Sequence, residues 1–251
     1  MKILAVDTAT TSCSVAVVNH TSICAELTTH KKQTHSKHLM PLIDSVLKSA
    51  GFHIGDLDGF AVTVGPGSFT GLRIGIATIK GIASAVDKPA VGVSSLETLA
   101  WQCSHRSRLI CPLLDARKAE VYGATYRFSE DRLIQQTPAC AVGPGAFVRE
   151  IMEPCVFIGS GAQLYQKKIQ QALGDKAYFV PDEQNIIRAS TIALLSLNRF
   201  KINDTVRVTD LIPLYIRKSD AEIRVAAKSV VQSAPTENAE AAGQVKPKKN
   251  I

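Results

Sequence analysis

The sequence lacks the features that mark membrane proteins and disulfide-stabilised secreted proteins. No apolar run reaches the ~18 residues that a membrane-crossing helix needs, so we expect no membrane contact. The six cysteines are scattered without a C-x-x-C pair, mostly inside apolar stretches, where a thiol behaves as a small hydrophobic group. The chain opens directly on the strand-like segment 2–7, and we expect no signal peptide and a cytoplasmic location.

The usual phosphate-binding and dinucleotide-binding motifs are also absent. Segment 65–71 is glycine-rich and leads into a predicted helix, a setting that often binds anions. It has neither the G-K-[ST] ending of a P-loop nor the G-x-G-x-x-G spacing of a dinucleotide site. A tight, closely packed turn is favoured, and we expect no cofactor. The open alternative is weak phosphate or nucleotide contact at Asp7, Thr8, Thr10, Gly67 and Ser68.

The composition is that of an ordinary globular protein. Of the 251 residues, 45% are hydrophobic and 20% charged, enough for one large domain or two lobes with a buried core. The net charge of +7 is compatible with a nucleic-acid partner. Part of that charge lies near the C-terminus, at 246–249, and no basic run is interleaved with aromatics. A solvated basic surface is therefore the favoured interpretation.

Two successive parts of the chain show the same order of predicted elements. The first has strands at 2–7, 13–19, 23–29, 59–64 and 90–93, and helices at 36–50, 69–86 and 94–101. The second has strands at 108–114, 120–128, 133–136, 155–158 and 177–180, and helices at 147–152, 163–173 and 186–201. The repeat predicts an α/β protein of two similar βββαβαβα lobes, 1–103 and 104–224. Segment 225–251, without periodicity, predicts a disordered tail.

A duplicated lobe with an Asp-Thr hairpin at residues 7 and 8 resembles the superfamily of actin, heat-shock chaperones and sugar kinases, the actin-like (ASKHA) fold. Two longer stretches, ILAVDTATTSCSVAVV (3–18) and GPGSFTGLRIGIATIKGIASAVDKPAVGVSSLETLA (65–100), are similar to the TsaB family. Shorter matches lie at 35–44, 114–122 and 213–217, so the resemblance covers about residues 1–218. It implies a non-catalytic scaffold in the tRNA modification that makes threonylcarbamoyladenosine.

The same resemblance distinguishes the chain from TsaD, the related catalytic subunit. TsaD-like proteins carry an H-x-x-x-H pair that holds the catalytic metal, and Ser95 and Leu99 occupy the matching positions here. Leucine cannot bind a metal and a neutral serine hydroxyl is a poor ligand, so we expect no metal and no catalysis. The resemblance implies a TsaD-like subunit and a TsaE-like ATPase as partners, a homodimer when alone, and tRNA contact only through the complex.

Two enzyme classes remain as alternatives. The main one is an ATP-dependent kinase of the actin-like superfamily, for which segment 157–162 is the only candidate second phosphate loop. A glycoprotease-like peptidase is less favoured, because the metal-binding histidines are missing.

The predicted helix 69–86 is apolar on two sides. Leu72, Ile76, Ile79, Ala83 and Val86 fall on the side that should cover the sheet. The opposite side carries small residues where a water-facing helix would place Glu, Lys or Gln, although each glycine costs about 0.5–1 kcal/mol relative to alanine. The helix 36–50 has a similarly widened apolar stripe. We predict a partner-binding surface of Met40, Leu47, Thr70, Gly71, Ile74, Gly75, Ala77, Thr78, Gly81 and Ala85. The open alternative is that these small residues allow close packing within one subunit.

Three other groups of reactive or charged side chains favour structural roles. His35 and His38 share a helical face but have no evident third metal ligand. Cys103 and His105 lie too close in sequence to align well as nucleophile and base. The cluster Arg117, Lys118 and Glu120 has a solvated charged face as its ordinary interpretation, and the family resemblance leaves a structural ion pair or a partner contact open beside it.

Overall fold

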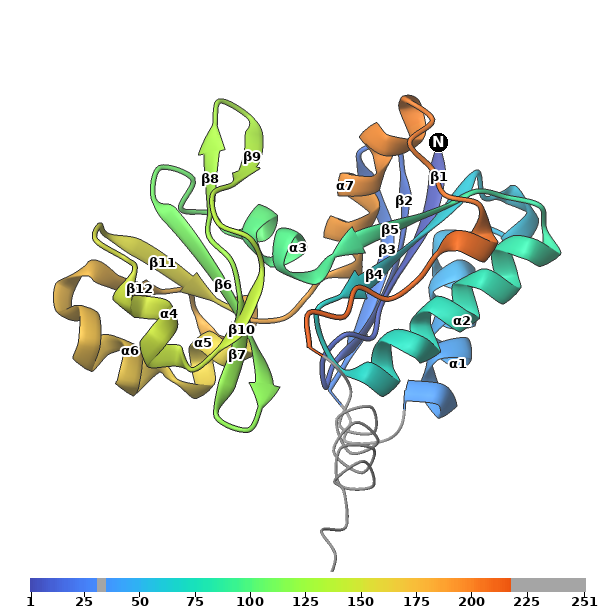
Figure 1. Ribbon diagram of the computed structural model, residues 1–251. Coiled ribbons are helices and arrows are strands. Elements are labelled where there is room, and N and C mark those ends of the chain that lie inside the picture. Colours follow the sequence, from blue (N-terminus) through green and yellow to red (C-terminus); the bar gives the residue numbers. More distant parts are fainter. Residues whose placement is uncertain (31–34, 218–251) are drawn as a thin grey trace, which may run out of the picture. The chain divides into compact units, whose positions relative to one another are not determined.

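A mixed five-stranded sheet forms the first half of the protein in the computed structural model, which describes residues 1–30 and 35–217 (Figure 1). Its strand order is β3-β2-β1-β4-β5. The strands are β1 (Lys2–Asp7), β2 (Cys13–Asn19), β3 (Ser22–Thr29), β4 (Gly59–Gly65) and β5 (Ala90–Ser94). The first three pair antiparallel, whereas β4 and β5 run parallel to β1.

The second sheet repeats this order as β10-β7-β6-β11-β12. These strands are β6 (Leu109–Arg117), β7 (Glu120–Gly123), β10 (Cys140–Val142), β11 (Cys155–Ile158) and β12 (Ala177–Phe179). The repeated order, with the same parallel and antiparallel pairings, confirms the predicted actin-like fold.

The strand predictions for the second half need one correction. The predicted strand 120–128 is interrupted, because β7 ends and a hairpin begins, formed by β8 (Tyr126–Ser129) and β9 (Arg132–Gln135). This hairpin joins the sheet where Tyr126 pairs with Ile110 of β6. The third position in the sheet belongs to β10, which the sequence did not indicate, and not to the predicted strand 133–136. A three-residue strand is too short to carry a readable alternation of polar and apolar residues.

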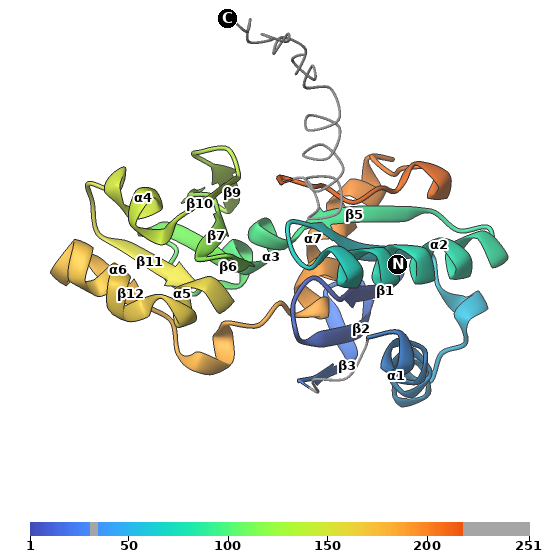
Figure 2. The same cartoon turned by 60° about the horizontal axis from the view of Figure 1, so that its bottom comes forward.

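Helices cover both faces of the first sheet. Helices α1 (His35–Ala50) and α2 (Phe69–Ala85) lie on one face and α7 (Ala189–Lys201) on the other (Figures 1 and 2). Strand β1 contributes side chains to the hydrophobic core on both faces of the sheet, since alternate side chains point to opposite faces. Leu4 and Val6 pack with the helix pair, while Ile3 and Ala5 join the cluster that contains the buried side chains of α7.

One face of the second sheet is covered by short helices. These are α4 (Pro144–Arg149), α5 (Ser160–Leu164) and α6 (Gln166–Leu173). Where the sequence predicted one helix over 163–173, Tyr165 separates two. Helix α3 (Ser95–Gln102) begins at the capping residue Ser94, whose hydroxyl accepts from the Glu97 amide, and it packs against β6 and β9. The remaining helical turns are η1 (Ile54–Asp56), η2 (Gly174–Lys176), η3 (Asp182–Gln184) and η4 (Val208–Asp210).

Helix α7 belongs to the predicted second half of the chain but packs on the first sheet. It contacts β1, β2, β4 and β5. Its start is fixed to β3 by Glu26, whose carboxylate accepts hydrogen bonds of 2.9 Å from the amide and the hydroxyl of Ser190. The amide of Ala189 donates to the hydroxyl of Ser14 at 3.1 Å. The core of the first sheet therefore includes a helix that lies beyond residue 103.

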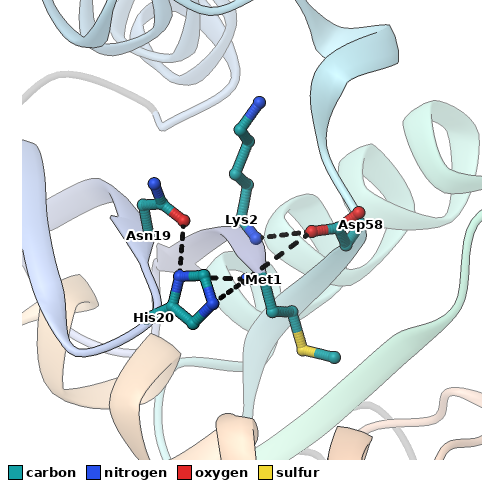
Figure 3. Close-up of polar contacts among 5 residues, drawn as sticks. All are labelled: Met1, Lys2, Asn19, His20 and Asp58. Atoms are coloured by element: carbon teal, nitrogen blue, oxygen red, sulfur yellow. Dashed lines mark hydrogen bonds and ion pairs between the residues drawn. The ribbon is translucent and has the colours of Figure 1, made fainter.

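Polar contacts tie the start of β1 to the segment before β4 (Figure 3). The carboxylate of Asp58 accepts from the Lys2 amide at 2.7 Å and lies 3.9 Å from the amino group of Met1. That amino group also lies 3.2 Å from the imidazole of His20, which is itself 3.0 Å from the side-chain oxygen of Asn19. These contacts hold the turn between β2 and β3, in which His20 adopts a left-handed φ of 54°.

Two sequence predictions concern the chain as a whole. The predicted disordered tail, 225–251, lies outside the described residues. Among the helices of residues 1–30 and 35–217, none is long and apolar enough to cross a membrane.

Candidate functional site

The two positions that match the metal-binding histidines of TsaD-like proteins lie in α3. The side chains of Ser95 and Leu99 are fully buried, and Leu99 belongs to the core cluster shared by both sheets. The described part of the chain holds no group of three His, Cys, Asp or Glu side chains that could bind a metal ion. This helix therefore serves the packing of the core.

Asp7, the acidic residue of the first hairpin, is completely buried. Its Oδ1 accepts from the hydroxyl of Thr63 at 2.7 Å and from the amide of Ala9 at 3.1 Å, while Oδ2 has no hydrogen-bond partner among the described residues. Burial raises the pKa of this carboxyl group to about 7, although the hydrogen bond from Thr63 acts in the opposite direction. A buried carboxyl group with so high a pKa is poorly suited to hold a hydrated metal ion in an open phosphate site.

The glycine-rich segment 65–71 packs against the first hairpin and leaves little room beside it. A Cβ atom on Gly67 would lie 2.4 Å from the carbonyl oxygen of Ala9, and one on Gly71 would lie 2.0 Å from that of Thr8. The Ser68 amide donates to the Ala9 carbonyl at 2.7 Å, and the Ser68 hydroxyl accepts from the Gly71 amide as the N-cap of α2. These glycines permit a close approach of two backbones, as the favoured interpretation predicted.

The other candidate phosphate residues also have partners inside the protein. The hydroxyl of Thr8 donates to the carbonyl of Gly71 at 2.8 Å. The hydroxyl groups of Thr10 and Ser12 lie 2.8 Å apart. The five candidates lie at the first hairpin and in the glycine-rich segment, and the side chains of four of them, Asp7, Thr8, Thr10 and Ser68, take part in intramolecular hydrogen bonds.

The candidate second phosphate loop, 157–162, is equally closed. A Cβ on Gly159 would lie 2.4 Å from the carbonyl oxygen of Leu113. The amide of Gly159 donates to the Asn185 side chain at 2.7 Å, and the Ser160 hydroxyl accepts from the Asp115 amide at 3.2 Å. Of the two loops that could hold phosphates in a kinase, one is therefore packed against the turn of the first hairpin and the other against β6.

The histidine and cysteine candidates have structural contacts. One imidazole nitrogen of His35 lies 2.8 Å from the carbonyl oxygen of Thr10, which fixes the start of α1 to the first hairpin. Cys103 is buried and burial raises the pKa of its thiol, whereas His105 is exposed. A buried thiol with a raised pKa is a poor nucleophile.

The charge cluster at the start of the second sheet forms ion pairs. The Glu120 carboxylate lies 2.6 Å from the guanidinium group of Arg217, and Arg117 lies 3.4 Å from Asp115. The structural interpretation of Glu120 is thereby confirmed. Its partner lies near the end of the described chain, where the sequence offered no local pattern.

The outer face of α2 presents the small residues that the sequence singled out. Thr70, Ala77, Gly81 and Ala85 are exposed, and Met40 of α1 has 49% of its side chain exposed. A Cβ on Gly81 would meet nothing within 4 Å, in contrast to the two glycines near the start of the helix. The described packing of the chain gives no reason for a glycine at that position.

Five of the ten predicted surface residues are less exposed than expected. Leu47 is 6% exposed within the core, and Gly71 and Gly75 are buried against Thr8. Ile74 and Thr78 are half-buried, with Ile74 packed on the edge of the α1–α2 core cluster. A helical wheel centred on the sheet misplaced them because α1 and the first hairpin also cover the flanks of α2. The remaining five form what we call the α2 outer face: Met40, Thr70, Ala77, Gly81 and Ala85.

A second feature of this region could not be read from the sequence. Residues 206–217, which we call the strap, run along one flank of α2 (Figure 1). The ring of Tyr215 stacks on that of Phe69 with centroids 4.3 Å apart, and its hydroxyl accepts from Arg73 at 2.8 Å. Farther along, the ammonium group of Lys80 donates to the carbonyl of Thr209 at 2.8 Å. The polar flank of α2 therefore contacts protein rather than bulk water alone.

Comparison with known proteins places these features in a family context. The family model for TsaD, described as tRNA N6-adenosine threonylcarbamoyltransferase, matches residues 22–225. The tRNA threonylcarbamoyladenosine biosynthesis protein TsaB of Bacillus subtilis is 34% identical over 227 residues, spanning 89% of this chain and 97% of that protein. TsaB of Escherichia coli is 31% identical over 231 residues, spanning 88% and 96%. The solved structure of YeaZ from Pseudomonas aeruginosa has a TM-score of 0.71 at 25% identity, covering 85% of this chain and 99% of that chain.

Proposed function

Since this chain belongs to the TsaB family of tRNA threonylcarbamoyladenosine biosynthesis proteins, we propose that it is a non-catalytic, cytoplasmic subunit that binds and stabilises a TsaD-like catalytic subunit. A TsaE-like ATPase is its second partner, and the chain pairs with itself when alone. It contributes to tRNA modification through the complex. The match to a TsaD family model supports a partner of the same lobe plan, because similar surfaces can pair around a pseudo-twofold axis.

The observation that carries this proposal is the exposed glycine in the middle of α2. Gly81 is exposed and has open space around its Cα, so an alanine there would fit the described fold. Glycine inside a helix costs about 1 kcal/mol relative to alanine. A helix backbone of another chain that approaches the α2 outer face closely would account for both the glycine and the small neighbours.

A non-catalytic role is supported by the closed loops and the buried acid. Both glycine-containing loops are packed against backbone of the same chain at distances that exclude even a methyl group. Asp7 is buried with a pKa of about 7, and Ser95 and Leu99 serve the core of α3. These features favour a scaffold over the kinase and the peptidase alternatives.

A charge placed on the α2 outer face tests the proposal. Ala77 is exposed, so in Ala77→Arg the guanidinium group reaches water in the free chain and the fold should be kept. In the complex the same group would be buried without a partner, a penalty of roughly 3–5 kcal/mol. At ~1.4 kcal/mol per tenfold, binding to the catalytic subunit should weaken by about a hundredfold or more. Gln171→Arg, on the exposed face of α6, is the matched control.

The readouts are circular dichroism, elution volume and titration against a TsaD-like subunit. A folded Ala77→Arg variant that dimerises and captures the catalytic subunit as the wild type does would place the interface elsewhere. If the Gln171→Arg control also failed to capture the catalytic subunit, the loss of binding would come from the added positive charge itself and not from its position on α2.

A further inference from the structure

The second sheet has one face that the short helices do not cover. Leu109, Cys111, Cys155 and Phe157 point toward α4, α5 and α6. The alternate residues point to the opposite face, where Ile110, Val156 and Tyr178 lie side by side in the register of β6, β11 and β12. Helix α7, the last helix of the repeat, packs on the first sheet instead. Helix α3 contacts β6, and Ile110 and Val156 are fully buried, whereas Tyr178 in β12 is 41% exposed.

Two arginines lie over aromatic rings. The guanidinium carbon of Arg108 lies 3.7 Å from the ring centroid of Tyr178, which is 41% exposed. The guanidinium carbon of Arg106 lies 4.5 Å from the centroid of Phe128 and 5.6 Å from that of Trp101. These two aromatics contact each other with centroids 5.6 Å apart. Arg106 and Arg108 are two positions apart in the loop before β6, so we treat these two groups, three rings and two cations, together and call them the platform.

The cations of this platform are weakly engaged. Within residues 1–30 and 35–217, Arg108 has no salt-bridge partner. Arg106 faces only Asp131, at 3.7 Å, and that carboxylate is fully exposed, a geometry that contributes little in water. The neighbouring acid Glu153 is held by Arg127 at 2.6 Å. A guanidinium group held over an aromatic ring still carries N–H donors that can bind an anion.

Resting on the proposed function in tRNA modification, we infer that this platform binds unpaired nucleotides of RNA. Aromatic faces stack on bases of any sequence, and arginines beside them contact the backbone phosphates. The rings of Trp101, Phe128 and Tyr178 would stack on bases, and Arg106 and Arg108 would contact the phosphates. The surface lies on the second sheet, apart from the α2 outer face, so RNA and the catalytic subunit can be bound together.

The test uses the full chain in its complex with the TsaD-like subunit and an unmodified tRNA transcript as the probe. Arg106→Gln and Arg108→Gln remove the charges and leave the rings in place. Each should weaken tRNA binding by about five- to tenfold, and the double variant should lower the slope of log affinity against log salt by roughly 1.4. Arg149→Gln, exposed on α4 behind the same sheet, is the matched control and should change neither quantity. A fully paired RNA duplex should bind more weakly than the transcript.

The possible results separate this inference from the proposed function. Loss of tRNA affinity in the arginine variants, with capture of the catalytic subunit intact, supports the platform. Unchanged affinity and salt slope in the double variant would overturn it while leaving the scaffold role standing. A double variant that keeps tRNA affinity but no longer captures its partner would make this face a protein contact and also overturn it. Failure of the wild-type chain to capture the catalytic subunit would instead count against the proposed function.

Discussion

At the scale of single residues, the buried carboxyl group of Asp7 links the hairpin to the pH dependence of stability. Its pKa is about 7 in the folded protein and near 3.8 when unfolded. The unfolded chain therefore releases this proton at lower pH than the folded chain does. The contribution of Asp7 to folding is fully present below about pH 3.8 and is lost as the pH rises through 7.

We predict that Asp7→Asn removes this pH dependence. Three units of pKa difference correspond to roughly 4 kcal/mol, and asparagine has nearly the same shape and can accept the same two hydrogen bonds. Urea unfolding at pH 5 and pH 8 should show the wild type losing stability across that interval, while Asp7→Asn stays nearly level. Parallel stability curves for the two proteins would mean that Asp7 is already ionised in the folded state.

The glycines of α2 mark the limit of residue-scale prediction. Gly71, Gly75 and Gly81 look equivalent in the sequence, and all three were predicted to meet a partner. The structure separates them, because the first two accommodate Thr8 within the same chain and only Gly81 faces open space. The sequence shows that all three positions are glycine. It does not show that Thr8, which directly follows β1, packs against Gly71 and Gly75 and not against Gly81.

At the scale of the element, α2 should respond in opposite ways to the same substitution at two of its glycines. In Gly71→Ala the new Cβ would lie 2.0 Å from the Thr8 carbonyl oxygen. Because backbone atoms cannot move aside easily, we expect the free energy of unfolding to fall by ~1–3 kcal/mol or more, as in an overpacked core. Gly81→Ala should instead stabilise the free chain by about 0.5–1 kcal/mol.

The same pair of variants also reports on pairing. Gly81→Ala should weaken capture of the catalytic subunit despite its raised melting temperature, because the added methyl group stands where a second backbone is proposed to approach. Thermal unfolding and partner titration measure the two effects separately. A Gly81→Ala variant that binds its partner more tightly would contradict close helix contact at that position.

At the scale of the whole molecule, the sequence predicted which helices and strands form better than it predicted what each of them packs against. The repeated strand order was readable because buried strands are short apolar runs between turn residues. The packing position of α7 could not be read from the sequence, since an apolar helix side does not specify which sheet it covers. Glu26 and Ser190, which fix it to β3, are ordinary polar residues until the fold brings them together. The strap was missed for the same reason.

This arrangement predicts that segment 1–103 cannot fold alone. Without α7 the first sheet would expose the side that carries Ile3, Ala5, Ala16 and Val18. We expect the isolated fragment to unfold without a cooperative transition and to bind hydrophobic dyes, whereas the full chain unfolds in one sharp step. A fragment 1–103 with a well-dispersed amide spectrum and a sharp melting transition would show that α7 is dispensable to the first sheet.

The placement of α7 also affects the order of events during translation. The hydrogen bond from Ala189 to Ser14 joins residues 175 positions apart. At ~5–20 residues per second, the ribosome needs on the order of ten seconds or longer to deliver that helix after β2 has emerged. For this interval the first strands to leave the exit tunnel wait with one hydrophobic side uncovered. The nascent chain should therefore engage trigger-type chaperones early and release them only after α7 has emerged.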